Sequence, residues 1–150
     1  MAGSDNSHRS LKLEVPSQIQ YVDPVHTLAE RFAKLAGFDE DTALNIGIAV
    51  REAVINGIVH GNGADPKKIV KLRLSSGDNL FEACVQDQGP GYTPDESNDP
   101  TSAENLLNTS GRGLLMIRAY VDKVEFVNDE GGLSLRLVKR LETESETSSS

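Results

Sequence analysis

Hydrophobic and polar positions along the chain follow two periods, and each period predicts one kind of element. In residues 11–15 apolar and polar side chains alternate, which predicts a short strand, and residues 19–36 carry the apolar stripe of an amphipathic helix. A second helical pattern begins after Asp39 or Asp41, either of which can cap the helix, and it runs to the Gly-Asn-Gly breaker at 61–63.

Two hairpins and a further helix are predicted downstream. Four strand-like runs pair by sequence into the hairpins 69–75 with 80–87 and 123–127 with 133–138. Between the hairpins lie a segment with glycine and proline at 88–101, a short helical piece at 103–107 and a helix at 111–120. Hairpins beside helices indicate an α+β fold, in which the helices cover one face of a mainly antiparallel sheet.

The second predicted helix is apolar on nearly every face except for one polar line. Asn45, Glu52 and Asn56 are separated by seven and four residues, so at about 100° per residue they project within about 40° of one another. A helix with so much apolar surface is normally buried, and buried carboxylates and carboxamides need polar partners. The line therefore faces either a ligand or a hydrogen-bond network in the core, and the helix alone does not distinguish the two.

Length and composition favour a single domain in a soluble, cytoplasmic protein. The chain has 150 residues, 37% of them hydrophobic, and no run approaches the roughly 20 apolar residues of a membrane span. The start lacks the apolar core of a secretory signal, and the single cysteine, Cys84, has no partner for an internal disulfide. Residues 1–10 and 141–150 are too polar to form a core and are expected to be disordered, which leaves 11–140 as the folded domain.

The charge of the chain limits its partners. The formal net charge is −8 and the pI is about 4.8. These values argue against non-specific binding to nucleic acid phosphates, and they favour electrostatic attraction to a basic protein.

A second group of candidate residues follows the strand predicted at 80–87. Asp87 ends that strand on the same face as its apolar side chains, so its carboxylate is expected to point toward the interior. Gly89 and Gly91 follow in the next turn, where glycine can take positive φ and lie close to a ligand. Alternatively, Asp87 serves only to cap a turn.

A third cluster, Ser110-Gly111-Arg112-Gly113, opens the last predicted helix. Glycines at a helix start expose backbone N–H groups beside the positive end of the helix dipole, which suits phosphate binding. The alternative is that these glycines serve only chain geometry.

The order and spacing of these motifs resemble the N, G1 and G2 boxes of the GHKL ATPases. The matching segments are Glu52-Ala53-Val54-Ile55-Asn56 with His60-Gly61-Asn62, then Asp87-x-Gly89-x-Gly91, then Gly111-Arg112-Gly113-Leu114. That superfamily contains gyrase, the catalytic domains of histidine kinases and the bacterial anti-sigma-factor serine kinases. The chain is most similar to the last group, over residues 11–140, and its small size fits that group.

The resemblance implies a two-layer α/β sandwich with ATP held between the sheet and the helices. It makes Asn56 the ligand of Mg²⁺, an ion that accepts oxygen donors and keeps most of its waters. Glu52, one turn earlier, would orient or deprotonate the attacking hydroxyl group. His60 belongs to the motif and is grouped with the nucleotide-binding residues. Its expected role is that of a structural cap near the helix end and not that of a catalyst. Arg112 can reach a phosphate or a partner, or remain a solvated lid side chain.

The same resemblance assigns the contacts to the base and the phosphates. Asp87 would accept a hydrogen bond from the adenine amino group, which gives a reason for a carboxylate on an apolar strand face. Gly89 and Gly91 would let the backbone approach the base. Gly111 and Gly113 would form the hinge of a lid whose backbone N–H groups bind phosphate.

Two features depart from the family pattern. The family usually has threonine after the glycine that opens the last strand, and this chain has Leu133 there. Ser134 follows, but alternation places it on the other face of the strand unless a bulge shifts the register. The lid region, 94–110, holds no basic residue, so no phosphate ligand is assigned within it.

Three functions are weighed on these grounds. The first is an ATP-dependent protein serine kinase that phosphorylates a small anti-sigma-factor antagonist and holds a sigma factor inactive when that antagonist is modified. The second is a nucleotide-binding anti-sigma module without efficient transfer, and Glu52 favours the first over it. The third, a histidine-kinase catalytic domain, is disfavoured because the chain is short and has no helical hairpin with a phospho-accepting histidine. The family also implies a homodimer formed through the N-terminal strand and the first helix.

Overall fold

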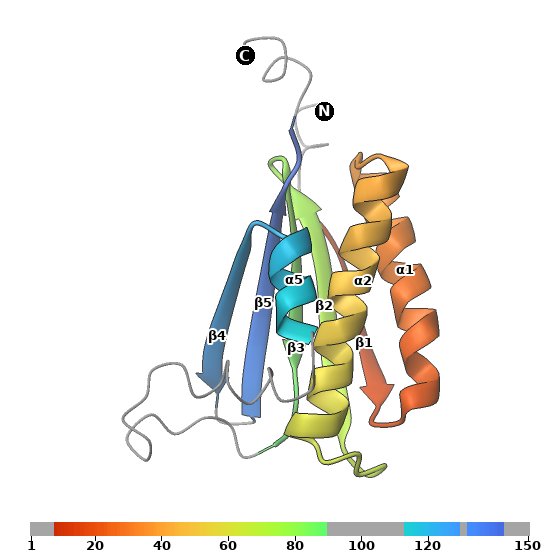
Figure 1. Ribbon diagram of the computed structural model, residues 1–150, viewed down its shortest axis with the longest axis vertical. Helices are drawn as coiled ribbons and strands as arrows, with labels where there is room; N and C mark the ends of the chain where they lie inside the picture. The colour runs from red at the N-terminus through yellow and green to blue at the C-terminus, as the bar shows by residue number, and fades with distance from the viewer. Residues whose placement is uncertain (1–7, 90–112, 130–131, 143–150) are drawn as a thin grey trace.

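The computed structural model describes residues 8–89, 113–129 and 132–142, and Figure 1 shows how their elements are arranged. The chain order is β1 (Arg9–Pro16), α1 (Val22–Ala36), α2 (Glu40–Asn56), β2 (Ile69–Gly77), β3 (Leu80–Gln86), α5 (Gly113–Tyr120), β4 (Lys123–Asp129) and β5 (Gly132–Arg140). A 3₁₀ turn, Ile19–Tyr21, precedes α1, and a π-helix, Gly57–Gly61, continues α2. The helical piece predicted at 103–107 lies outside the described residues.

The strands of the described chain form one antiparallel sheet in the order β1-β2-β3-β5-β4. Both predicted hairpins are present, because β2 pairs with β3 and β4 pairs with β5. Helices α1, α2 and α5 all lie over the same face of the sheet (Figure 1). The prediction of an α+β fold with helices on one face of a mainly antiparallel sheet is therefore confirmed.

The turn between β2 and β3 has only two residues. Gly77 pairs with Leu80, so Asp78 and Asn79 form the turn, with φ angles of 54° and 63°. Two successive positive φ angles are the mark of a type I′ turn, whose twist matches that of the strands and in which Asn and Asp are favoured.

Of the two caps predicted for α2, the structure uses Asp39. Its Oδ1 accepts a hydrogen bond from Thr42 N at 2.8 Å. Hydrogen bonds from Thr42 lower the pKa of Asp39, because they stabilise the charged carboxylate. Asp41 lies in the first turn instead, where a negative charge is favourable beside the positive end of the helix dipole.

Helix α2 is the centre of the hydrophobic core, as its apolar surface predicts. It lies between α1 and α5 (Figure 1), and its almost fully buried apolar residues are Ala43, Ile46, Ala49, Val50, Ala53 and Val54. By length and composition, residues 40–61 are the one helical stretch among the described residues that could cross a membrane. However, 56% of its apolar window is buried inside the fold, which is the situation of a core helix.

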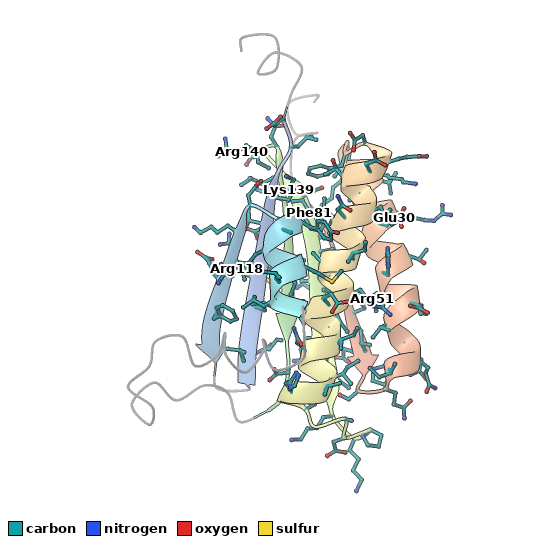
Figure 2. All side chains as sticks on the ribbon, viewed as in Figure 1. Glu30, Arg51, Phe81, Arg118, Lys139 and Arg140 are labelled. Atoms are coloured by element: carbon teal, nitrogen blue, oxygen red, sulfur yellow. The ribbon has the colours of Figure 1, made fainter. Side chains whose placement is uncertain are left out.

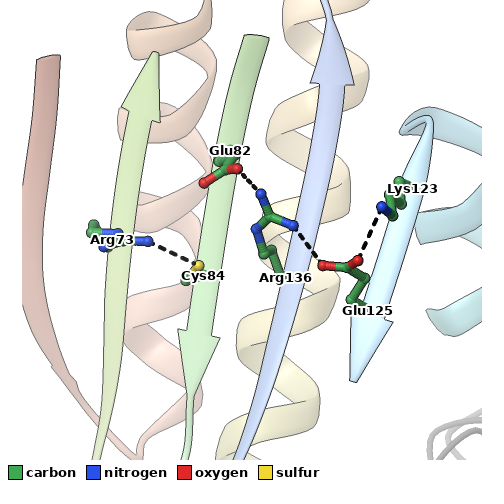
Figure 3. Close-up of polar contacts among 6 residues, drawn as sticks. All are labelled: Arg73, Glu82, Cys84, Lys123, Glu125 and Arg136. Atoms are coloured by element: carbon green, nitrogen blue, oxygen red, sulfur yellow. Dashed lines mark hydrogen bonds and ion pairs between the residues drawn. The ribbon is translucent and has the colours of Figure 1, made fainter. Parts of the chain in front are cut away.

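The face of the sheet that the helices leave open is polar. Glu82, Arg136 and Glu125 lie on three adjacent strands, and Arg136 donates hydrogen bonds to both carboxylates (Figure 3). Lys123 lies 3.1 Å from Glu125 Oε2. The bonds to Glu125 and Glu82 raise the pKa of Arg136, and the bonds from Arg136 and Lys123 lower the pKa of Glu125.

Replacing Arg136 with glutamine is expected to weaken the dependence of stability on acid pH. The pKa of Glu125 in the folded protein lies below its ordinary value of 4.5, so its stabilising contribution is present above that pH. The contribution is lost as the pH falls through the lowered folded-state pKa. Arg136→Gln removes the main cause of the shift, so the melting temperature should fall less than that of the wild type between about pH 5 and pH 3.

Thermal unfolding followed by circular dichroism at these pH values measures the effect. Arg73→Gln is the matched control, because Arg73 lies on the same sheet face but contacts the Cys84 sulfur rather than a carboxylate. It should keep the wild-type dependence. If the melting temperatures of the wild type and of Arg136→Gln fall equally at acid pH, the network of Arg136 with Glu82 and Glu125 does not determine how stability depends on acid pH.

Candidate functional site

The polar line of α2 ends where the helix changes its winding. Asn45 and Glu52 are half-buried, and Asn56, the last residue of α2, is only 3% exposed. From Gly57 to Gly61 the chain continues as a π-helix, whereas the sequence pattern predicted an uninterrupted α-helix. Single π-helical turns occur frequently at functional sites, and this one begins directly after Asn56.

The Glu52 carboxylate is held by its neighbour on α2. Arg51 Nη1 donates to Glu52 Oε2 at 3.2 Å, and Arg51 Nε donates to Asp23 Oδ1 at 3.3 Å. Figure 2 shows Arg51 on α2, on the side toward α1. Because Asp23 lies in the first turn of α1, Arg51 joins the two helices beside the carboxylate. Within the described residues, Glu52 Oε1 accepts no hydrogen bond.

Asp87 lies at the end of β3, buried, with one carboxylate oxygen engaged. It is 6% exposed, and its Oδ1 accepts hydrogen bonds from Gly89 N at 2.9 Å and from Leu133 N at 3.1 Å. Its Oδ2 accepts none from the part of the chain that the structure describes. A carboxylate oxygen can accept hydrogen bonds, so Oδ2 has the chemistry to accept one from a ligand N–H group.

The end of α2 and the end of β3 are in direct contact, and two glycines make this possible. A Cβ on Gly61 would lie 2.0 Å from Asp87 Oδ2, and a Cβ on Gly89 would lie 1.9 Å from the Gly61 carbonyl oxygen. Gly89 is not among the residues with positive φ, so close packing rather than backbone conformation requires glycine there. The segment that carries Asn56 and the strand end that carries Asp87 therefore meet.

Replacing Gly61 with alanine is expected to distort this contact. The added methyl group would displace the Asp87 carboxylate, which two N–H groups hold in place. Overpacking of this kind costs about 1–3 kcal/mol of stability. Chemical denaturation measures that loss, and titration with ATP should show weaker binding.

Gly63→Ala is the matched control for this substitution. Gly63 has a φ of +62°, but a Cβ there would meet no atom within 4 Å. The control should therefore lose about 1 kcal/mol through backbone strain and bind ATP as the wild type does. Wild-type ATP affinity in Gly61→Ala would contradict a role for this contact in the site.

The departure at Leu133 does not remove the strand from the site. Leu133 shares the helix-covered face with the buried Leu135 and Leu137, and its backbone N–H donates to Asp87 Oδ1. The pairing of β3 with β5 runs without a bulge, so Ser134 lies on the open face, as alternation predicts. This strand therefore supports Asp87 through its backbone, a contact that does not depend on the leucine side chain at position 133.

The other predicted site residues are only partly described. Gly113 is the buried first residue of α5, which packs against α2. His60 lies half-buried in the π-helix, whose end is closed by the backbone bond from Asn62 N to Gly57 O at 2.8 Å. Gly91, Gly111 and Arg112 lie outside the described residues.

One buried polar residue at this end of the fold was missed as a candidate. Asn62 is 3% exposed and hydrogen-bonded to three other segments. In the sequence it follows a glycine after a helix and has the character of an ordinary turn residue. The one signal for Asn62 was its position in the His60-Gly61-Asn62 motif. A single sequence, however, does not show that this asparagine is buried.

Comparisons with known proteins agree with this geometry. The model of the histidine kinase-like ATPase domain matches residues 15–139. The chain is 25% identical over 145 residues to the serine-protein kinase RsbW of Bacillus subtilis, covering 93% of this chain and 90% of that protein. It is 32% identical over 104 residues to the anti-sigma F factor of Oceanobacillus iheyensis, covering 67% of this chain and 71% of that protein.

A solved structure shows the same fold. The crystal structure of the RsbU and RsbW domains of a Mycobacterium tuberculosis protein superposes with a TM-score of 0.64 at 21% identity. The match covers 89% of this chain and 32% of that longer chain. The family model spans most of the 150 residues and the GHKL-type boxes lie within it, so this protein belongs to the family of histidine kinase-like ATPase domains.

Proposed function

We propose that this protein is an ATP-dependent protein serine kinase that modifies an anti-sigma-factor antagonist and sequesters a sigma factor. One observation carries the proposal: the helical segment that continues from Glu52 and Asn56 packs against Asp87, whose Oδ2 accepts no hydrogen bond within the described residues. The carboxylate and the carboxamide of α2 therefore lie on a helical segment that meets the strand end with the second carboxylate, Asp87. The names of the relatives, a serine-protein kinase and an anti-sigma factor, support the same reading.

Asp87 selects adenine in this proposal. Its Oδ2 accepts a hydrogen bond from the exocyclic amino group, while the N–H groups of Gly89 and Leu133 hold Oδ1. Guanine carries a carbonyl oxygen at that position, which would face the carboxylate as a second acceptor. Leaving a buried acceptor unpaired costs about 1–3 kcal/mol, so the protein should prefer ATP to GTP.

Asn56 fits a role as a Mg²⁺ ligand. Mg²⁺ binds oxygen donors, keeps several waters and needs few protein ligands, so one buried carboxamide oxygen suffices. When bound, the ion would neutralise negative charge on the ATP phosphates. The described residues contain no cluster of three or more histidine, cysteine, aspartate or glutamate side chains that could hold a metal.

Glu52 is the general base of the proposed transfer. Its free Oε1 takes the proton of the substrate serine hydroxyl, the serine oxygen bonds to the γ-phosphorus, and ADP leaves with the electrons of the broken bond. Arg51 holds the other oxygen and fixes the direction of the carboxylate. Gly91 and the lid residues Gly111, Arg112 and Gly113 are assigned to base and phosphate contacts on the motifs alone.

The proposed partners are proteins. The net charge of −8 favours a basic sigma factor surface and disfavours direct binding to nucleic acid. A cytoplasmic location and a homodimer are part of the proposal, and they rest on the family resemblance and on the single cysteine. The folded domain is assigned to residues 11–140, with tails at 1–10 and 141–150 that lie largely outside the described residues. The structure extends the fold slightly further at both ends, because β1 begins at Arg9 and Leu141 N donates to the Asn79 carbonyl oxygen.

Incubation with γ-labelled ATP and each candidate antagonist encoded in the same operon tests the proposal. Label on a serine of one antagonist supports the kinase.

One observation favours a second function, a nucleotide-binding anti-sigma module: Glu52 is already paired with Arg51, which limits its freedom to act as a base. Nucleotide-dependent binding of a sigma factor without any transfer would establish that module instead.

A further inference from the structure

Asn62 is a buried polar side chain that none of the proposed nucleotide contacts uses. Its Nδ2 donates to Ser17 Oγ at 2.8 Å and to the Ile69 carbonyl oxygen at 2.9 Å. Its Oδ1 accepts from Gln88 N at 2.6 Å. Both amide hydrogens and the carbonyl oxygen are therefore in use, and this one side chain joins the segment after β1, the first residue of β2 and the segment after β3.

Gln88 is held through both its backbone and its side chain. Besides the bond to Asn62, its Oε1 accepts a hydrogen bond from Ile69 N at 2.8 Å. The preceding residue is Asp87, whose own N–H donates to the Leu133 carbonyl oxygen at 3.1 Å. The backbone at Asp87 is thus fixed at its own N–H group by β5 and at the next N–H group by Asn62.

The position of Asp87 decides which groups its Oδ2 can reach. On one side of that oxygen the backbone of Gly61, the residue before Asn62, packs closely, since a Cβ on Gly61 would lie 2.0 Å from it. A small shift of the strand end would therefore move Oδ2 relative to any bound base. A binding side chain must be held within about 0.5 Å of its productive position, so selectivity also depends on the residues that hold it there.

We infer that Asn62 is a positioning residue for base selectivity, which fixes the end of β3 so that Asp87 Oδ2 faces the amino group of adenine. The inference rests on the proposed function, because it takes Asp87 as the residue that reads the base. Without the Asn62 side chain, Gln88 N–H and the Ile69 carbonyl lose their buried partner. The strand end keeps its bonds to β5 but loses the restraint at the Gln88 N–H group.

The test is the ratio of ATP to GTP affinity, measured by calorimetry with Mg²⁺ on the full chain. The wild type should prefer ATP by about 5- to 150-fold, the equivalent of one buried unpaired acceptor. Asp87→Asn should remove this preference, and Asn62→Ala should reduce it at least about fivefold. Ser17→Ala is the matched control, because it breaks the same network without touching the link to Gln88, and it should lower the melting temperature but leave the ratio within about twofold.

The outcomes separate the inference from the function on which it rests. If Asp87→Asn leaves the ratio unchanged, Asp87 does not read the base and the proposed base contact fails. If Asp87→Asn lowers the ratio but folded Asn62→Ala does not, the inference is overturned. Should Asn62→Ala not fold, two other measurements replace it: the ATP/GTP affinity ratio of Asn62→Ser, and the rate of hydrogen exchange of the Gln88 amide in the wild type. A retained ratio in the serine variant, or exchange as fast as at an exposed amide, also overturns it.

Discussion

Replacing Glu52 with glutamine is expected to lower phosphoryl transfer by about 10²–10⁴, the usual contribution of a positioned general base. Glutamine keeps the size of the side chain and can still accept a hydrogen bond, but it cannot take the proton of the attacking hydroxyl group. ATP affinity and sigma factor binding should remain, because Glu52 contacts Arg51 and not the residues at the base end of the site. Single-turnover transfer of labelled phosphate and nucleotide titration measure the two effects separately.

Glu40→Gln is the matched control for this substitution. It makes the same chemical change on the same helix, at the exposed first turn, far from Asn56. It should transfer phosphate at the wild-type rate. If Glu52→Gln transfers as fast as the wild type, Glu52 is not the base, and its bond with Arg51 is a structural link between α1 and α2.

Replacing Asn56 with alanine is expected to abolish the gain in ATP affinity that Mg²⁺ provides. The carboxamide oxygen is the one protein ligand proposed for the ion, and alanine has none. The fold should survive, since alanine is the most favourable residue in a helix. Calorimetry of ATP binding with and without Mg²⁺ measures the change, and circular dichroism checks the fold.

Asn45→Ala provides the comparison for Asn56→Ala. Asn45 lies on the same polar line, but eleven residues earlier, which is about 16 Å along the helix and beyond the reach of the same ion. Its alanine variant should keep the Mg²⁺ effect. Unchanged Mg²⁺ dependence in Asn56→Ala would take Asn56 out of the site.

The architecture was predictable because hydrophobic periodicity and turn chemistry agree along most of the chain. Helix α2 was predicted from its apolar surface, and the two hairpins were predicted from the alternation of apolar and polar residues. For the first hairpin, the turn residues Asp78 and Asn79 added to the prediction. The choice between Asp39 and Asp41 as cap was not, because both are good capping residues and only the backbone conformation separates them. The 3₁₀ turn before α1 and the π-helix after α2 depend on packing that periodicity does not report.

The site was predictable as a set of motifs but not as a contact. Sequence placed Asp87 on the interior face and glycines after it, yet it could not show that Gly61 packs on that carboxylate. It also could not show that the backbone of Leu133 supports Asp87 where the family has threonine. Asn62 was missed because polar residues after helices are common in turns, and burial of this one depends on three segments distant in sequence.

The central claim is that the end of α2 and the end of β3 form one ATP site. The most direct measurement is the change in backbone amide NMR signals when Mg²⁺ and a non-hydrolysable ATP analogue are added to the full chain. The largest changes should fall on Gly57, Gly61 and Leu133, which surround Asp87, while Asp78 and Asn79 in the hairpin turn at the opposite end of the sheet should not change (Figure 1). Changes that cluster at the hairpin turn or on the open face of the sheet, with none near Asp87, would contradict the account.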